Sequence, residues 1–461
     1  MDAADIQKRK DRTITLSIET KVREFPGKVL LSCFLAEKGF RVILTNDRKY
    51  DKVIDENSWL FIDRNTFASR KSFFKNLRRS NIDIACLDEE GIVWANPLIY
   101  LRRLSKESLN HTSLFFTWGK KQSDLVNQLK ETTRVVESGN PRMDLLRPEL
   151  RGIYQDQVDD LKEKYGDFVL IVSNFAWNNH YYVNGEKENP SETYLKLLRH
   201  QGHIQNKEDE QYHLENLEYK TRVFDKLKKL VLFLGKELPD VPIIVRPHPS
   251  ENHKAWRDAM KEFSNIQVVF EGELEPWIMA AQSVIHNSCT SGVQAALVNR
   301  KSIAYMPFHN NKFEHEFPND VSAKAYTHEE VLDLVKEGPL TQEIPKEINE
   351  YISSLTGPFA SERIADTILE AYIAGIKNRQ KNYFKKIVFN QSVLLYKRLK
   401  RKLIKPKKFT ENREDYKKQK LDSLTSDEVD NCVVIYNKLL KRFGNIASRN
   451  IENTVEITMK Q

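Results

Sequence analysis

Short apolar runs alternate with helical segments along most of this chain of 461 residues, and this alternation strongly limits the folds available to it. The first example is a strand at residues 13–18, a helix at 26–38 that ends at Gly39, and an apolar strand at 41–44. A strand, a helix and a second strand in this order are typical of a parallel βαβ unit. The repetition of this pattern predicts an α/β fold with doubly wound, largely parallel sheets.

The pattern restarts in the second half of the chain, after a charged helix predicted at residues 154–164. Phe168–Val172 is the strongest strand signal of the sequence, and further strands follow with helices between them. At roughly 100–200 residues per domain, the length accommodates two such domains and a smaller region. We therefore predict a Rossmann-like domain at residues 13–150 and a second one at 151–375, which would end in a closing helix.

The composition narrows the class of protein further. Aromatic residues make up 10% of the chain, which is too many for a disordered protein. No apolar run approaches the roughly 18 residues that a membrane span needs, and residues 1–12 do not resemble a secretory signal peptide. The four cysteines lie far apart, so we predict neither a disulfide framework nor a cysteine-bound zinc ion. These features predict a cytoplasmic protein.

The positive net charge of +8 belongs to one end of the sequence. Residues 376–461 carry 22 Lys and Arg against 9 Asp and Glu, whereas the rest of the chain has a net charge of −5. Residues 376–408 hold 13 basic residues and no acidic residue, interleaved with aromatic and aliphatic residues. We predict that residues 376–461 form a basic, mainly helical tail that binds an anionic partner. Within it we predict a helix that is capped by Ser426 and continues through Phe443.

Several polar motifs directly follow predicted strands, where ligands bind in open α/β sheets. Arg246-Pro247-His248-Pro249-Ser250-Glu251 comes after the strand at 242–245, and its two prolines restrict the backbone around His248. Arg246 and His248 are suited to holding a phosphate, and a histidine can also donate a proton to a departing phosphate. The alternative is a turn that ends the strand and carries a surface histidine.

A second motif, His286-Asn287-Ser288-Cys289-Thr290-Ser291-Gly292, lies between a predicted strand at 283–286 and a helix at 293–299. Small hydroxyl residues and a glycine at a helix start leave backbone N–H groups available for an anion. An ordinary Ser or Thr helix cap is the alternative. Because both motifs follow strands of one domain, together they favour a nucleotide-phosphate pocket, with Cys289 as a packing residue rather than a nucleophile.

An acidic turn, Asp88-Glu89-Glu90-Gly91, follows the strand predicted at residues 82–87. Carboxylates that crowd one another tend to raise the pKa of at least one of them, which makes a general base or a nucleophile available. The alternative is an acidic surface turn before a glycine. A fourth motif, residues 173–180, has amides, an aromatic ring and a histidine that suit sugar hydroxyls, and it equally fits the start of a polar loop.

The sequence lacks the motifs of metal sites, of two common nucleotide-binding folds and of nucleic-acid-binding modules. The chain has no H-E-x-x-H, no D-x-D at a strand end and no clustered metal ligands, so we predict no metal site. It has neither G-x-x-x-x-G-K-[ST] nor G-x-G-x-x-G, the P-loop and dinucleotide-binding motifs. No nucleic-acid-binding module stands out either, and we predict no nucleic acid partner.

Taken together, the motifs occur in an order that resembles the bacterial surface carbohydrate biosynthesis proteins. These are similar to the β-Kdo glycosyltransferases of capsule and O-antigen assembly, and more distantly to bacterial sialyltransferases. The resemblance spans roughly residues 21–374 and does not cover the tail. Its motifs are Arg23-Glu24, Leu87-Asp88-Glu89-Glu90-Gly91, Phe116-Thr117-Trp118-Gly119, Gly139-Asn140-Pro141-Arg142-Met143-Asp144, Ser173-Asn174-Phe175, Arg246-Pro247-His248-Pro249-Ser250-Glu251 and Cys289-Thr290-Ser291-Gly292, with Ser361-Glu362-Arg363-Ile364 near the end.

The resemblance implies a GT-B fold, in which two Rossmann-like domains face each other across a cleft, and a glycosyltransferase that needs no cofactor. In the related transferases an acidic turn supplies the catalytic carboxylate, which corresponds to Asp88, Glu89 or Glu90. A His-Pro motif and a Ser/Thr pair contact the phosphate of a CMP-sugar. The resemblance implies that His248, Pro249, Thr290 and Ser291 contact this phosphate. The strand-end motifs themselves add Arg246, Ser288 and Gly292 to the candidate donor-binding residues. The candidate sugar or acceptor contacts are Arg23, Asn140, Arg142, Asn174, Asn178 and His180.

The predicted function is transfer of a Kdo-type or related acidic sugar from a CMP-sugar to a bacterial surface polysaccharide acceptor. A CMP leaving group carries one charge, which a histidine, hydroxyls and a helix N-terminus can stabilise without a metal. Two alternatives stay open, a UDP-sugar epimerase of similar architecture and a non-catalytic assembly protein that binds nucleotide or glycan.

The tail can be related to this function. Because surface-glycan acceptors are commonly lipid-linked, we predict that residues 376–408 hold the protein at the anionic inner membrane surface. The alternative is a solvated arm, or a segment that packs on the acidic surface of a partner subunit.

Overall fold

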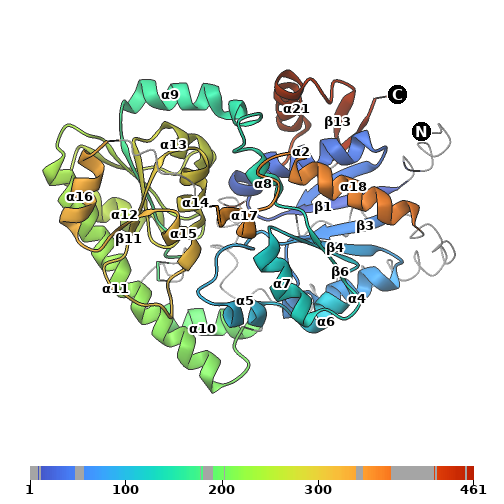
Figure 1. Cartoon of the computed structure of the whole chain (residues 1–461), viewed down its shortest axis with the longest axis horizontal. Helices are drawn as coiled ribbons and strands as arrows, with labels where there is room; N and C mark the ends of the chain where they lie inside the picture. Colours follow the sequence, from blue (N-terminus) through green and yellow to red (C-terminus); the bar gives the residue numbers. More distant parts are fainter. Residues whose placement is uncertain are drawn as a thin grey trace, which may run out of the picture. The chain divides into compact units, whose positions relative to one another are not determined.

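The computed structural model describes residues 9, 12–46, 55, 57–176, 178–179, 190–201, 203–338, 346–374, 420, 423–451 and 454–460 (Figure 1). The chain forms two compact units. The first contains Met1–Glu89, Leu104–Ile153 and Asn349–Gln461, and the second contains Glu90–Arg103 and Tyr154–Ile348. Each unit has a sheet of its own, so the prediction of two α/β domains is confirmed.

The first unit is built on one sheet of eight strands, namely β1 (Thr13–Ile18), β2 (Arg41–Asn46), β3 (Ser58–Asp63), β4 (Asp83–Leu87), β5 (Leu114–Thr117), β6 (Arg134–Glu137), β13 (Ile446–Ile451) and β14 (Thr454–Met459). Their spatial order is β13-β14-β2-β1-β3-β4-β5-β6, and β1 to β6 are parallel. The direction of the strand order reverses at β1. Ligands are therefore expected beyond the carboxyl ends of β1 and β3.

Helix α2 (Lys21–Glu37) is buried from Glu24 to Ala36. It is covered by α8 (Pro141–Asp144), α18 (Ala360–Ile373) and α21 (Ser426–Leu440), which all pack against it. The predicted start at Pro26 is wrong, because the Glu24 carboxylate accepts the backbone N–H groups of Glu19 and Thr20 and stabilises an earlier start. The other helical segments of this unit are η1 (Ala68–Arg70), α4 (Lys71–Arg79), α6 (Lys106–Asn110) and α7 (Lys120–Leu129). Two short segments, η2 (Arg151–Tyr154) and α17 (Ile348–Tyr351), each have one residue in the second unit.

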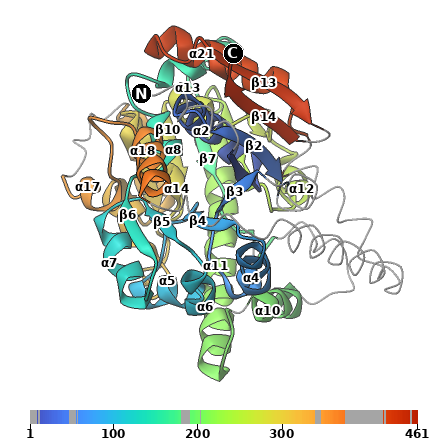
Figure 2. The ribbon, with the colours of Figure 1, turned by 90° about the vertical axis from the view of Figure 1, so that its right-hand side faces the viewer.

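The described C-terminal residues add two strands to this sheet, which the prediction of a mainly helical tail did not include. β14 pairs antiparallel with both β2 and β13, so the last two strands lie beside β2, a strand from the first tenth of the chain (Figure 2). Thr454–Met459 alternates polar and apolar residues, which is the pattern of a strand with one buried face. Thr425, not Ser426, caps α21, and the helix ends at Leu440. The basic residues 376–408 lie outside the described residues.

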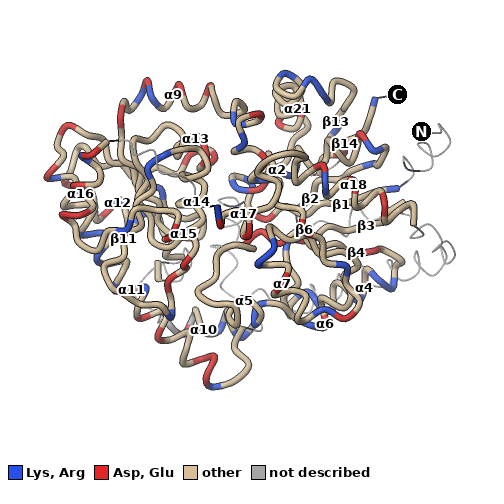
Figure 3. Tube along the Cα trace, in the orientation of Figure 1, with Lys and Arg blue, Asp and Glu red and all other residues tan. Residues whose placement is uncertain are grey.

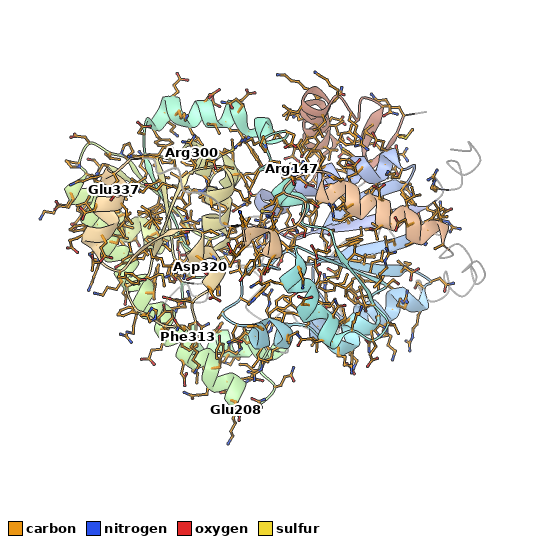
Figure 4. All side chains as sticks on the ribbon, in the orientation of Figure 1. Arg147, Glu208, Arg300, Phe313, Asp320 and Glu337 are labelled. Atoms are coloured by element: carbon orange, nitrogen blue, oxygen red, sulfur yellow. The ribbon has the colours of Figure 1, made fainter. Side chains whose placement is uncertain are left out.

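Helix α18 belongs to the first unit, although we predicted it as the closing helix of the second domain. The backbone N–H groups of its first two residues donate to the buried carboxylate of Asp144, each at 2.8 Å, and the Ser361 hydroxyl donates at 2.7 Å. A carboxylate at a helix N-terminus also interacts favourably with the helix dipole. Arg147, labelled in Figure 4, donates to two backbone carbonyls of the segment that precedes α18. These contacts attach α18 to the first unit.

The second unit is built on six parallel strands, namely β7 (Val169–Val172), β8 (Ile243–Arg246), β9 (Ile266–Val268), β10 (Ser283–His286), β11 (Lys301–Tyr305) and β12 (Ala323–Ala325). They lie in the order β12-β11-β10-β7-β8-β9, which is the strand order of the Rossmann fold. The order reverses between β7 and β10. In folds of this order, nucleotides bind beyond the carboxyl ends of the strands at that point.

Helices surround this second sheet (Figure 1). Val223, Leu227 and Leu230, from the longest of them, join a core that includes Val169 and Ile243 of the strands. Acidic and basic residues are interspersed along the helix at residues 155–165 (Figure 3). No helix of the described residues is long and apolar enough to span a bilayer. The helices are α5 (Pro97–Arg103), α9 (Gln155–Tyr165), α10 (Pro190–Gln201), α11 (Lys207–Glu237), α12 (His253–Met260), α13 (Leu274–Ala280), α14 (Thr290–Leu297), α15 (Glu316–Asp320) and α16 (His328–Lys336).

Candidate functional site

The main candidate site lies at the carboxyl edge of the second sheet. Ser173 directly follows β7, Asn287 directly follows β10, and His248 follows β8 after one residue. β8 and β10 flank β7, and neighbouring strands are about 4.8 Å apart, so the two outer strands are roughly 10 Å apart. Side chains from their ends can therefore reach one ligand beyond the end of β7.

Glu251 connects the ends of β7 and β8. Its fully buried carboxylate accepts hydrogen bonds from the Ser173 hydroxyl at 2.8 Å, the Phe175 N–H at 3.0 Å and the His248 N–H at 3.2 Å. The Trp256 indole N–H donates to it at 2.9 Å. Burial raises the pKa of Glu251, and these hydrogen bonds act in the opposite direction. Since these contacts are internal, Glu251 positions the turn that carries His248.

His248 is held in one tautomer by its own turn. Its Nδ1 accepts the backbone N–H of Ser250 at 3.1 Å, so the proton of the neutral ring lies on Nε2. Pro249 restricts the backbone between these two residues. The half-buried ring therefore carries its proton on Nε2, and an N–H group of this kind is suited to donate to a phosphate oxygen.

Arg246 is held by contacts within the protein. Its guanidinium is buried, donates to the backbone carbonyls of Glu271 and Gly272, and lies over the Trp277 ring with 4.9 Å to the centroid. Burial lowers the pKa of Arg246 to about 10. The side chain thus stabilises the turn after β9, and its contact with the donor stays a prediction.

Ser288 also has a structural role, because its side chain is fully buried in the loop after β10. Its φ of 47° is uncommon for a residue other than glycine. The Ser288 hydroxyl pairs with the Asn319 side chain at 3.1 Å, and its carbonyl accepts the His315 Nδ1–H at 2.8 Å. These contacts hold the turn that leads into α14 and occupy the Ser288 hydroxyl, so donor binding by Ser288 stays a prediction.

Gly292 is required by packing rather than by an anion. A Cβ atom at residue 292 would lie 2.2 Å from Nε2 of His286, whose ring is fully buried. That ring is held by the Ser322 hydroxyl at 2.9 Å and by the Cys289 N–H at 3.4 Å, so it has little freedom to move. Burial lowers the pKa of His286 to about 3, which keeps the ring neutral at physiological pH.

Gly292→Ala is expected to lower the free energy of unfolding by about 1–3 kcal/mol, the range for overpacking a core. Chemical denaturation measures this loss. In the Gly292→Ala/His286→Ala double variant the clash is absent, so the loss should be smaller than the sum of the two single losses. Additive losses would contradict the packing role.

Thr290 and Ser291 are the first two residues of α14. Thr290 is half-buried, and its hydroxyl has no hydrogen-bond partner within the described part of the chain. Ser291 is buried, with its hydroxyl 2.9 Å from Cys289 Sγ. The Thr290 hydroxyl and the first N–H groups of α14 are therefore the groups here that are suited to an anion.

Lys220 is a candidate site residue that the sequence motifs missed. Its Nζ donates to Asn287 Oδ1 at 2.8 Å, and Asn287 is held in turn by a hydrogen bond from Nδ2 to the Tyr305 carbonyl at 3.0 Å. Burial lowers the pKa of Lys220 to about 8, although Glu314 and Cys289 act in the opposite direction. Lys220 is one of several basic residues in α11, and only the fold brings it to the loop after β10.

The motif after β7 contributes mainly to the structure. Asn178 donates to the Leu217 carbonyl at 2.9 Å and to the Thr221 hydroxyl at 2.7 Å, which attaches this segment to α11. Asn174 is exposed and has no hydrogen bond to any described residue, so it stays available to a ligand. His180 lies outside the described residues.

The acidic turn after β4 divides between the two units. Asp88 and Glu89 belong to the first unit, whereas Glu90 belongs to the second, where its exposed carboxylate pairs with Arg103 at 2.6 Å. Glu89 is buried, and its Oε1 contacts the Lys28 ammonium at 3.0 Å. Its Oε2 has no hydrogen-bond partner in the part of the chain that the structure describes. Glu89 is therefore the acid of this turn that has a buried carboxylate oxygen without a hydrogen-bond partner among the described residues.

A buried ion cluster positions Glu89. The Lys28 ammonium contacts Glu24 at 2.9 Å and Glu89 at 3.0 Å, and it donates to the Ser17 carbonyl at the end of β1 at 2.6 Å. Arg23 contacts Glu24 at 3.2 Å. Although burial opposes charge on both groups, the cations hold the pKa of Glu24 well below its usual range, and the carboxylates raise the pKa of Lys28.

The other predicted contacts of the first unit adjoin this cluster. Asp88 accepts the side-chain amide of Gln122 at 2.9 Å, and its carbonyl accepts the Asn140 amide at 3.4 Å. Asn140 also caps α8 by accepting the Arg142 N–H at 3.0 Å. Arg142 is buried beside the Trp118 ring. Asp88, Asn140 and Arg142 thus lie at one end of the first sheet, in structural roles.

Comparison with known proteins gives likenesses of structure alone. No protein-family model and no curated protein sequence matches the chain. Similar solved structures include UDP-GlcNAc 2-epimerase from Methanocaldococcus jannaschii in complex with UDP-GlcNAc and UDP, with 12% identity and a TM-score of 0.47 over 78% of this chain and 99% of that one. Staphylococcus aureus MnaA with UDP has 14% identity and a TM-score of 0.47 over 80% and 99% of the two chains.

The wall teichoic acid polymerase TagF is a further similar structure, with 12% identity and a TM-score of 0.46 over 82% of this chain and 91% of that one. The similar structures thus include both epimerases and a polymerase. With TM-scores below 0.5, none of them decides what this chain does.

Proposed function

We propose that this chain is a glycosyltransferase that binds a nucleotide sugar through its second unit. The observation that carries the proposal is the set of donors beyond β7, β8 and β10. These donors are the His248 Nε2–H, the Thr290 hydroxyl with the first N–H groups of α14, and the Lys220 ammonium. A phosphate group matches such a combination of hydrogen-bond donors and positive charge. The Rossmann strand order supports a nucleotide as its carrier.

In the proposed reaction, an acceptor oxygen forms a bond to the anomeric carbon while the bond from that carbon to the phosphate oxygen breaks. His248 and the N-terminus of α14 would stabilise the charge on the departing phosphate. Glu89 is the proposed base that takes the proton of the acceptor hydroxyl, as the resemblance implies for an acid of this turn, and its buried Oε2 has no hydrogen-bond partner among the described residues.

The donor and the acceptor that we propose come from the resemblance to the bacterial surface carbohydrate biosynthesis proteins. It names a CMP-linked Kdo-type or related acidic sugar as the donor and a lipid-linked bacterial surface polysaccharide as the acceptor. Residues 376–408 would then hold the protein at an anionic membrane surface. Full-length protein should pellet with anionic vesicles at low salt and stay in solution at high salt. The control replaces the Lys and Arg of this stretch with Gln, because a truncation after Gly375 would also remove strands of the first sheet.

Isothermal titration calorimetry with CMP, CDP and UDP tests the proposed function. At least one nucleotide should bind, and His248→Ala should weaken its binding by about tenfold or more, as expected for the loss of a hydrogen bond to a charged group. His111→Ala, in the first unit, is the matched control and should bind like the wild type. No binding of any nucleotide would contradict the proposal.

The same titration separates the two alternatives. Tight UDP binding without a CMP response, together with interconversion of UDP-sugars in the absence of an acceptor, would favour an epimerase. Nucleotide binding without turnover of any sugar donor would favour an assembly protein.

A further inference from the structure

We propose that the Lys220 ammonium is the counter-ion of the phosphate group of the bound nucleotide. The inference rests on the proposed function and adds a residue that neither the motifs nor the resemblance included. Lys220 lies in the middle of α11, and its Nζ is directed at the loop after β10 by the 2.8 Å hydrogen bond to Asn287 Oδ1.

The partner of Lys220 is neutral, although the side chain is half-buried. In the described part of the chain, no carboxylate oxygen lies within 4 Å of its Nζ. Glu314, the acid that most affects its pKa, instead accepts the Tyr219 hydroxyl at 2.7 Å. By contrast, Lys228 of the same helix pairs with Asp225 at 2.9 Å. Withdrawing an ammonium from water is costly unless a counter-charge is present, and an anionic ligand would supply one.

The surroundings of Lys220 place that counter-charge beside the start of α14. Asn287 lies three residues before Thr290, the first residue of the helix. Cys289, between them, is close enough for Lys220 to lower the pKa of its thiol, although burial raises that pKa overall. Lys220 also lies near His315, whose Nδ1 donates to the loop. The Lys220 ammonium therefore contacts the loop that leads into the first N–H groups of α14. Both the ammonium and these N–H groups favour the binding of a phosphate.

Comparing ligands of different charge distinguishes a counter-ion from a lysine that only stabilises the structure. Lys220→Met keeps the apolar stem and removes the charge, so UDP and CDP should bind about tenfold to a hundredfold more weakly. The loss should be smaller for CMP, which carries less charge, and absent for uridine. Lys220→Arg should retain most of the affinity, because it retains the positive charge.

The pH dependence provides an independent readout. Because the pKa of Lys220 is about 8, the ammonium is charged below that pH and neutral above it. The affinity of the wild type for UDP should therefore fall as the pH rises from 7 to 9, and the affinity of Lys220→Met should change much less. Lys228→Met, on the same helix, is the matched control and should follow the wild type.

Calorimetric titrations of these variants separate the two proposals. If Lys220→Met binds UDP like the wild type, or loses uridine and UDP affinity equally, the counter-ion assignment is wrong while nucleotide binding stands. If the wild type binds no nucleotide, the proposed function and this inference both fail.

Discussion

Replacing Lys28 with methionine is expected to lower the free energy of unfolding by about 3–5 kcal/mol, the range for removing one partner of a buried ion pair. The change would leave the buried carboxylates of Glu24 and Glu89 without the ammonium that contacts both of them. Arg23 would still contact Glu24, but from a partly exposed position. Urea denaturation followed by fluorescence measures the change.

Two further variants identify the cause of this loss. Lys120→Met removes an exposed ion pair with Asp124 on α7, and it should leave the free energy of unfolding almost unchanged. In Lys28→Met/Glu89→Gln, one of the two uncompensated charges is also removed, so part of the lost stability should return. Equal losses for Lys28→Met and Lys120→Met would show that the buried cluster does not stabilise the first unit.

Glu89→Gln is expected to reduce sugar transfer by about 10²–10⁴-fold, the contribution typical of a general base. The amide preserves the size of the side chain but cannot take the proton of the acceptor hydroxyl. Nucleotide affinity should be unchanged, because the proposed nucleotide contacts all belong to the second unit. Steady-state kinetics with a nucleotide-sugar donor and calorimetry with its nucleotide measure the two effects.

Glu90→Gln is the matched control for this measurement. Glu90 is adjacent in sequence, but its carboxylate is exposed and pairs with Arg103 of the second unit. Its replacement should leave turnover close to that of the wild type. If Glu90→Gln abolishes transfer and Glu89→Gln does not, the base has been assigned to the wrong acid. A folding check is needed for Glu89→Gln, because the change also weakens the contact with Lys28.

The two sheets could be predicted because each buried parallel strand is a short apolar run between polar turns. Val169–Val172 is such a strand, and so is Ile243–Arg246. The prediction failed for the β13–β14 hairpin, whose partner β2 lies about 400 residues earlier in the chain. It also failed for the start of α2, which depends on hydrogen bonds from the Glu24 side chain to backbone N–H groups.

The candidate site could be predicted as a set of residue types at strand ends, but not as a set of available side chains. His248 and Thr290 lie where the strand order places a ligand, and both were identified from their motifs. Arg246 and Ser288 lie there too, yet their polar groups bond to partners such as the Glu271 carbonyl and the Asn319 side chain, which are distant in sequence. Such tertiary partners carry no local sequence pattern.

The most direct measurement is a crystal structure of the full chain with a bound nucleotide, UDP or CMP according to the titration. We expect a phosphate oxygen within hydrogen-bonding distance of His248 Nε2 and of the Thr290 hydroxyl or the first N–H groups of α14, with the Lys220 ammonium facing the phosphate. A nucleotide bound elsewhere, with its phosphate away from the carboxyl edge of β7, β8 and β10, would contradict the proposed site.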